Sequence, residues 1–253
     1  MLKGIVASIS LLFSVIALIF SLTLYINFKK FKKQADFETI NAQRINIVEP
    51  DGRKRLLIFN SAHMPGPVIE GHEYSPILRA GGGGKAAGVL FLNDDENEMG
   101  GVLWTGKKIG DKYFQEFYFS IDPYLQNELV SFAVSDQNGE REVRFTLFDR
   151  PFDPEGFKNL IAMYDQYIKL KDENPEKAKE IERQVNNYIK KFLANHTWEP
   201  QRFVMVKRQD GYAGIKLYDK VGRLKVEVGV DSAGAPAVKF YNEKGKVVKE
   251  IRE

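Results

Sequence analysis

This chain of 253 residues contains no cysteine and only three histidines, and its formal net charge is only +3. Because there is no cysteine, disulfides, thiol nucleophiles and zinc–thiolate sites are excluded. The 37 lysines and arginines are nearly balanced by 34 aspartates and glutamates. Proteins that bind nucleic acid usually carry a strongly basic face or stripe, so we expect no nucleic-acid partner.

Long hydrophobic runs are scarce as well, with one exception near the N-terminus. Residues 4–26 (GIVASISLLFSVIALIFSLTLYI) contain no charged side chain. A helix of this length covers roughly 34 Å, which is enough to cross a hydrocarbon core of about 30 Å. The run is longer than the apolar region of a signal peptide, and no small-residue cleavage pattern follows it. The sequence therefore predicts an uncleaved transmembrane anchor at residues 1–26, with the lipid bilayer as the partner of residues 4–26.

The charges beside this run predict its orientation. Four lysines lie between residues 29 and 33, in a juxtamembrane connector at 27–43, whereas only Lys3 and the terminal amine precede the run. Basic flanks stay on the cytoplasmic side. We therefore expect a single-pass protein of the plasma (inner) membrane with its C-terminal part in the cytoplasm. Large β domains behind an N-terminal anchor often face outward, which makes the periplasmic or extracellular side the alternative.

Short alternating segments begin at Arg44 and continue to residue 150. The stretch RINIVEPDGRKRLLIFN is typical of a strand, a turn at Asp51 and Gly52, and a second strand. Further strands are predicted at KAAGVLFLN, GGVLWTG, KYFQEFYFSI, ELVSFAVSD and REVRFTLFD, with an Asn-Gly turn signal before the last. Residues 44–150 are thus expected to form the first part of a β domain.

Residues 151–198 break this rhythm. Asp153 and Asn174 each provide a capping residue that is followed by proline, the arrangement favoured at the start of a helix. Apolar residues then recur every three to four positions, namely Leu160, Ile161, Tyr164 and Ile168, and later Ile181, Val185, Tyr188, Ile189 and Phe192. The pattern predicts an inserted hairpin of two amphipathic helices.

The second part of the β domain, residues 199–253, is unusually regular. Turn glycines at 211, 222, 234 and 245 are spaced 11, 12 and 11 residues apart. The segments IVEPDGRKRLLI, LYDKVGRLKVEV and FYNEKGKVVKEI share the order strand, turn, glycine, basic residue, strand. The predicted fold is therefore mainly β with a helical insertion, an antiparallel meander, barrel or sandwich of repeated hairpins with about a dozen short strands, behind an N-terminal transmembrane helix.

Several of these segments also resemble a family of uncharacterised bacterial proteins. The most specific are RINIVEPDG and MPGPVIEG, and GVLFLNDDENEMGGVLWTGKK, LFDRP and GRLKVEVGVDSAGAPAVKFYNEKGKVVKEI extend the likeness over most of residues 44–253 outside the helical hairpin. Members look like one N-terminal membrane span followed by this β-rich domain. The resemblance implies a bacterial membrane-anchored domain and transfers no activity and no catalytic residue.

A glycine run at residues 79–88, RAGGGGKAAG, is the first candidate for chemistry. A phosphate-binding P-loop ends in Gly-Lys-Ser or Gly-Lys-Thr and leads into a helix, whose N-terminus holds the phosphates. Here Ala86 follows Lys85 where the hydroxyl residue is needed, and a strand pattern comes next. We therefore expect a loop or turn without a bound nucleotide.

Acids and histidines between residues 63 and 98 are the candidates for a divalent-cation site. They are Asp94, Asp95, Glu96, Glu98, His63 and His72. Dense carboxylates can hold Ca²⁺, although their order does not match an EF-hand loop, and a solvated hairpin loop is the alternative. The histidines lie in a Pro-Gly loop that fixes no ligand spacing. No other cofactor is expected.

Aromatic residues are the candidates for an interaction surface. Trp104, Tyr113 and Tyr118 are the residues expected to contact a partner, and burial in the core is the alternative. On a strand, Phe117 and Phe119 cannot share a face with Tyr118.

Intact catalytic motifs are absent from the sequence, because no serine lies in a G-x-S-x-G elbow. We therefore expect a membrane-anchored, non-catalytic interaction or scaffold module that binds other membrane proteins or copies of itself. The alternative is a hydrolase or a divalent-cation-dependent ligand-binding protein that uses the loop region at 63–98.

Overall fold

A computed structural model describes the chain apart from residues 1, 32–36, 80–84, 151–152, 196–199 and 253. Within the helices, the side chains of residues 2–12, 28–31 and 192–195 also lie outside the described part. The chain divides into two compact units, residues 1–42 and residues 43–253.

Helix α1 (Leu2–Phe31) makes up most of the first unit. Its described side chains, residues 13–27, are all exposed. In the part of the chain that the structure describes, no helix is long and apolar enough to cross a membrane. The transmembrane helix predicted at residues 4–26 therefore has no support there, and the side chains of its residues 4–12 lie outside the described part.

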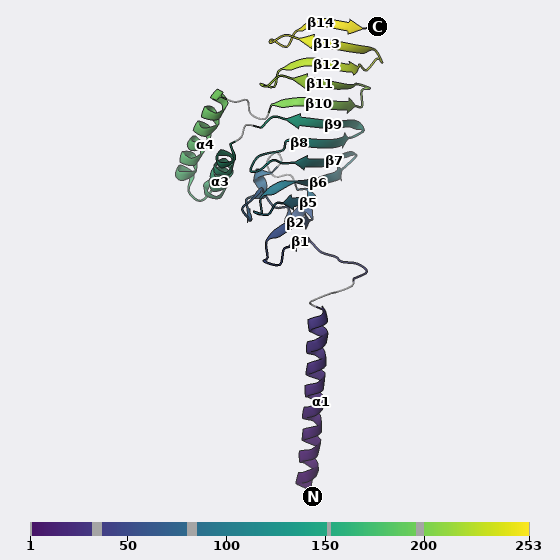
Figure 1. The fold of residues 1–253 in the computed structure, drawn as a ribbon, viewed down its shortest axis with the longest axis vertical. Coiled ribbons are helices and arrows are strands. Elements are labelled where there is room, and N and C mark those ends of the chain that lie inside the picture. The colour runs from purple at the N-terminus through teal and green to yellow at the C-terminus, as the bar shows by residue number, and fades with distance from the viewer. Residues whose placement is uncertain (1, 32–36, 80–84, 151–152, 196–199, 253) are drawn as a thin grey trace. The chain divides into compact units, whose positions relative to one another are not determined.

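An antiparallel sheet of twelve strands forms the second unit, and its strands follow one another in sequence order (Figure 1). The strands are β1 (Arg44–Val48), β2 (Lys54–Phe59), β5 (Ala87–Leu92), β6 (Glu98–Ile109), β7 (Lys112–Ile121), β8 (Val130–Gln137), β9 (Glu140–Phe148), β10 (Gln201–Arg208), β11 (Ala213–Tyr218), β12 (Leu224–Val230), β13 (Pro236–Tyr241) and β14 (Val247–Arg252). The prediction of a mainly β antiparallel meander is confirmed. Because β1 and β14 are the two edges of one open sheet, the closed and the two-layered alternatives are wrong.

Tight turns of one design join the strands from β11 to β14. In the turn after β11, Asp219 Oδ1 accepts hydrogen bonds from the backbone N–H groups two and four residues later, at 3.0 Å each. Gly222 in this turn has a φ of +79°, which glycine adopts without a steric cost. The turns that begin at Asp231 and Asn242 repeat the same bonds. The regular glycine spacing in the sequence is thus the spacing of a repeated hairpin turn.

A folded segment at residues 61–79 covers part of one face of the sheet. It contains the short elements η1 (Ser61–His63), β3 (Val68–Ile69), β4 (His72–Glu73) and η2 (Pro76–Leu78). Its apolar side chains join those of β2 and β5 in the main core, which consists of Leu57, Phe59, Met64, Val68, Leu90 and Leu92. We call this side of the sheet the core face.

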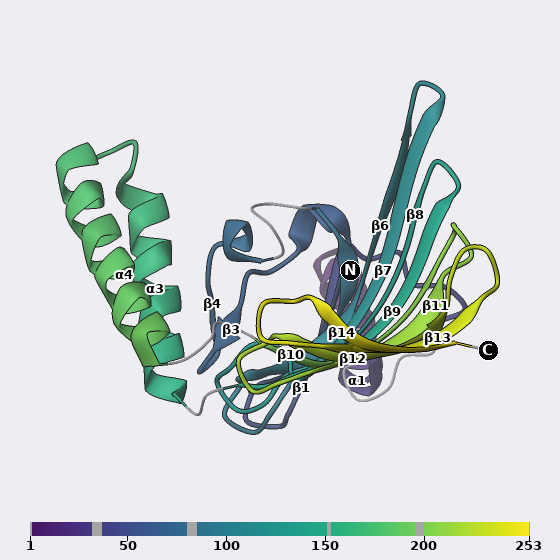
Figure 2. The same ribbon diagram turned by 90° about the horizontal axis from the view of Figure 1, so that it is seen from above.

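Helices α3 (Pro154–Leu170) and α4 (Pro175–Asn195) form the predicted hairpin. Asp153 caps α3 by accepting a hydrogen bond from the N–H of Gly156 at 3.0 Å. The pair buries its own small core around Leu160, Ile181 and Val185. In Figure 2 the helices and the β3–β4 segment lie on the same side of the sheet, so both belong to the core face.

Candidate functional site

Apolar side chains run across all twelve strands on the other face of the sheet. Directly opposite residues of neighbouring antiparallel strands point to the same face, so the pairing register links them into rows. The central row takes one residue from each strand, in sheet order Ile45, Ile58, Val89, Val102, Phe119, Phe132, Phe145, Met205, Ile215, Val228, Val238 and Ile251. Every member of this row is apolar.

Two flanking rows continue this composition, because residues two positions apart on a strand share a face. One flanking row is Ile47, Leu56, Phe91, Gly100, Ile121, Val130, Leu147, Phe203, Leu217, Val226, Phe240 and Lys249. The other runs from β5 to β13 and is Ala87, Trp104, Phe117, Val134, Val143, Lys207, Ala213, Val230 and Pro236. We call the three rows the apolar face; within them only the two lysines are charged.

Solvent reaches the apolar face along its whole length. Trp104 is 44% exposed, Met205 49% and Ile251 50%. Members of the central row are exposed or half-buried, whereas the neighbouring residues Leu57 and Leu90 on the core face are buried. The buried core therefore lies on one side of the sheet only. A contiguous exposed apolar surface of this extent marks an interaction site.

From β11 onwards, the core face carries charged side chains in place of a buried apolar core. Lys216, Glu227, Lys239 and Glu250 lie opposite one another on successive strands and alternate in sign. The hydroxyl group of Tyr212 donates a hydrogen bond of 2.8 Å to Glu227. No residue of strands β11 to β14 is buried on either face. Water thus solvates charged groups on one side of these strands and apolar groups on the other.

Of the aromatic candidates, two lie on the apolar face. Trp104 belongs to a flanking row, and Tyr113 shares the strand face of Phe117 by alternation along β7. Tyr118 points to the core face, where its hydroxyl group donates a hydrogen bond of 2.7 Å to Glu128 Oε1. Phe119, in the central row, was not among the residues expected to contact a partner.

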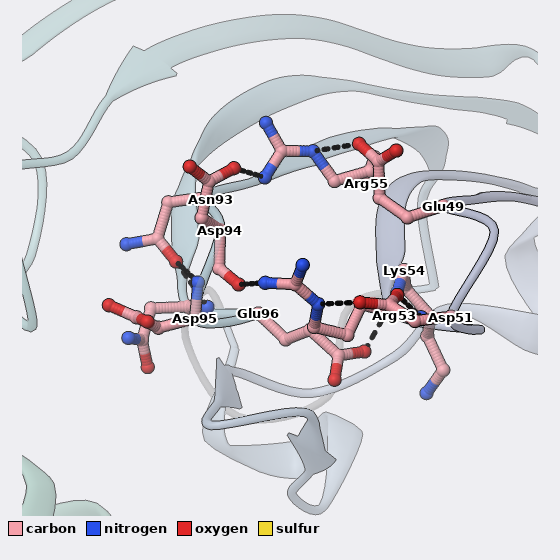
Figure 3. A network of polar contacts seen from close by, with 10 residues as sticks. Glu49, Asp51, Arg53, Lys54, Arg55, Asn93, Asp94, Asp95 and Glu96 are labelled. Carbon is pink, nitrogen blue, oxygen red and sulfur yellow. Dashed lines mark hydrogen bonds and ion pairs between the residues drawn. The ribbon is translucent and has the colours of Figure 1, made fainter.

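Basic side chains contact the acidic loop after β5 (Figure 3). Asp94 accepts hydrogen bonds from Arg55 at its carboxylate and from Arg53 at its backbone carbonyl. Glu96 accepts a hydrogen bond of 2.8 Å from the backbone N–H of Lys54. These contacts connect the loop after β5 to the hairpin of β1 and β2.

Histidines and acids of the 63–98 region do not converge. His63 Nδ1 lies 2.9 Å from Asn60 Oδ1, the ring of His72 packs edge-on against Tyr74, and Glu98 is paired with Arg79. Over the described residues, no group of three or more histidine, aspartate or glutamate side chains is placed to hold a metal ion. The weak divalent-cation site proposed from Asp94, Asp95, Glu96, Glu98, His63 and His72 stays a prediction, and these contacts give it no support. The carboxylates of Asp94 and Glu98 pair with Arg55 and Arg79.

The glycine run lies only partly within the described chain. Arg79 at its start belongs to the core face, and strand β5 begins at Ala87, two residues after Lys85. Residues 80–84 lie outside the described part. The strand predicted after Lys85 is present, and a strand offers no helix N-terminus to a phosphate.

A cleft of about 1500 Å³ lies on the core face between α3 and strands β5 to β7. Its walls include Leu103, Leu160 and Tyr164, and Glu98 and Asp122 also line it. Burial, together with the nearby charges of Glu98 and Glu128, raises the pKa of Asp122 to about 7. Chemically, the cleft offers the carboxyl group of Asp122, whose raised pKa favours its protonated form. No sequence motif identified Asp122, because its neighbours come from separate segments.

No protein-family model and no curated protein matches this chain. The resemblance to a bacterial family that the sequence suggests stays a prediction.

Proposed function

We propose that this protein is a non-catalytic interaction module anchored in the plasma membrane, and that the apolar face is its contact surface. The observation that carries the proposal is the central row, an uninterrupted line of exposed or half-buried apolar side chains from Ile45 to Ile251. Single exposed apolar residues are ordinary in soluble domains, whereas a contiguous apolar surface is typical of a docking site.

Membrane attachment in this proposal rests on the sequence. The uncharged run at residues 4–26 is long enough to span a bilayer, and the lysines at residues 29–33 favour a cytoplasmic domain. A reporter fused to the C-terminus, compared with the same fusion lacking residues 1–26, tests both points. We expect membrane retention and cytoplasmic reporter activity from the full chain, and loss of retention from the shortened one.

Absence of cysteine makes the contact surface directly testable. A single cysteine at Val228, on the apolar face, is compared with a single cysteine at Lys239, on the core face of the neighbouring strand. In the folded chain Val228 is exposed and Lys239 is half-buried. A bare domain should therefore react with a maleimide at least as fast at position 228 as at position 239.

Native membranes should reverse that order. If a partner covers the apolar face, Val228→Cys reacts several-fold more slowly than Lys239→Cys, and the two rates become similar after unfolding in urea. Labelling of Val228→Cys that is as fast as that of Lys239→Cys in native membranes would show a bare face and would refute the proposed function.

A further inference from the structure

The apolar face needs a covering layer of its own dimensions. Twelve strands about 4.8 Å apart give a length of about 53 Å, and three rows of side chains give a width of about 20 Å. The face therefore presents roughly 1000 Å² per copy. A stable protein–protein interface buries about 800 Å² on each partner. The apolar face is thus large enough to hold a complex together without any other contact.

Its composition is that of the apolar centre of an interface. The central row contains no charge, and the two lysines, Lys207 and Lys249, lie in the flanking rows. Three phenylalanines, Phe119, Phe132 and Phe145, occupy successive strands in the middle of the sheet. Aromatic side chains are enriched, and charged ones depleted, at the centre of interfaces.

Shape decides which partner fits. An added peptide strand would pair with the edge at β14 and would leave the face bare. One helix is only about 10 Å wide and would need roughly 35 residues to reach from β1 to β14. A second sheet of twelve strands matches the face in length, width and composition. Sheets pack face to face about 10 Å apart, with their inner side chains interdigitated.

We infer that the partner on the apolar face is a second copy of this chain, so that two sheets form a symmetric sandwich with their charged core faces outward. This inference rests on the proposed function and names its partner. The dimer buries the central row of both copies. The alternating charges on β11 to β14 stay in water.

The test uses the full-length chain in detergent micelles and measures its molar mass by light scattering at micromolar concentration. We expect a dimer for the wild-type chain. The double variant Ile215→Lys/Val228→Lys places four extra charges in the central rows of the dimer, and we expect it to raise the dissociation constant at least 100-fold. The matched control, Lys216→Glu/Glu227→Lys, swaps charges on the core face of the same two strands and should remain dimeric.

Cross-linking provides a readout that does not depend on these charged variants folding. Met205 lies in the central row and is exposed in one copy, so a single Met205→Cys should join two copies through a short bis-maleimide. A single Lys239→Cys on the core face should not. A dimer that cross-links through position 239, or one that survives the lysine pair unchanged, overturns the inference.

Failure of the inference and failure of the proposed function give different results. A chain that is monomeric in micelles, while Val228→Cys stays protected in native membranes, refutes the dimer but leaves the interaction module standing. Protection of Val228→Cys in vesicles that contain only the monomeric chain and phospholipid would assign the face to lipid instead of a second copy. A monomeric chain with a freely labelled position 228 refutes both.

Discussion

Replacing Arg79 by methionine should strongly destabilise the second unit. The guanidinium group donates hydrogen bonds to Glu98 Oε1 at 2.6 Å and to the backbone carbonyls of Pro65 and Gly66 at 3.1 and 2.7 Å. The side chains of Arg79 and Glu98 are only 11% and 13% exposed. Removing one partner of such a pair leaves the other charge buried and uncompensated, which costs about 3–5 kcal/mol.

Urea unfolding of the full-length chain in detergent measures this cost. We expect Arg79→Met to lower the free energy of unfolding by about 3–5 kcal/mol, because the pair also connects the 61–79 segment to β6. Arg202→Met is the matched control. Arg202 pairs with Asp149 at 2.6 Å, but the two side chains are 41% and 52% exposed, so its loss should cost about 1 kcal/mol or less.

Arg79→Met combined with Glu98→Gln should recover part of the lost stability, because no unpaired charge is left buried. If Arg79→Met proves no more destabilising than Arg202→Met, the pair is not shielded from water as described, and the argument for a fastened 61–79 segment fails.

Three other changes test separate parts of the fold. The pKa of Asp122 is raised to about 7, above its unfolded value of about 3.9. The free energy of unfolding should therefore fall as pH rises from about 4 to 7. Asp122→Asn should flatten this slope in urea titrations at several pH values. Hydrogen bonds, chiefly from Arg44, lower the pKa of Glu73 to about 2. The ionised Glu73 therefore stabilises the fold above about pH 4.3, and this contribution is lost as pH falls towards 2. Glu73→Gln should show less acid destabilisation across that range. At Gly100 (φ +115°) a Cβ atom would lie 2.2 Å from a backbone carbonyl oxygen of β7, so Gly100→Ala should lower the free energy of unfolding by at least about 2 kcal/mol. Gly110 also has a positive φ but has free space around it, so Gly110→Ala should lower it by about 1 kcal/mol in the same denaturation assay.

Local signals in the sequence were sufficient to predict the strands and several hairpin turns, but they left open whether the strands form a meander, a barrel or a sandwich. Glycines such as Gly222 and Gly234 stand where the backbone takes a positive φ, and an aspartate three residues earlier closes each turn. A short turn forces the two strands that it joins to pair. These local rules account for the hairpins and for the capped helix at Asp153. They do not account for the pairing of β2 with β5 or of β9 with β10, which long segments join.

Which face of the sheet is buried could not be predicted in the same way. Alternation along β7 separates Phe117 and Phe119 from Tyr118, but it does not say which set meets the core. That depends on the register of twelve strands and on where the 61–79 segment packs. A slip of one residue in any strand would move its side chains to the other face.

The contacts of the candidate cation ligands could not be predicted from the sequence for a related reason. The two arginines that contact Asp94, Arg53 and Arg55, lie about forty residues earlier in the sequence. The basic run GRKR at residues 52–55 was the available signal, since opposite charges in neighbouring hairpins can pair across a sheet. Arg79, Glu98 and Asp122 likewise come from three segments with no shared motif.

Because one hairpin turn is repeated, the number of repeats determines the length of the sheet. Each repeat of 11 or 12 residues adds one strand, and each strand extends the apolar face by about 4.8 Å. Strands β11 to β14 bond only to their immediate neighbours, so duplicating or deleting a repeat here would alter reach without rebuilding a core. At the C-terminal end, the contact surface can therefore be lengthened or shortened in equal steps of one strand.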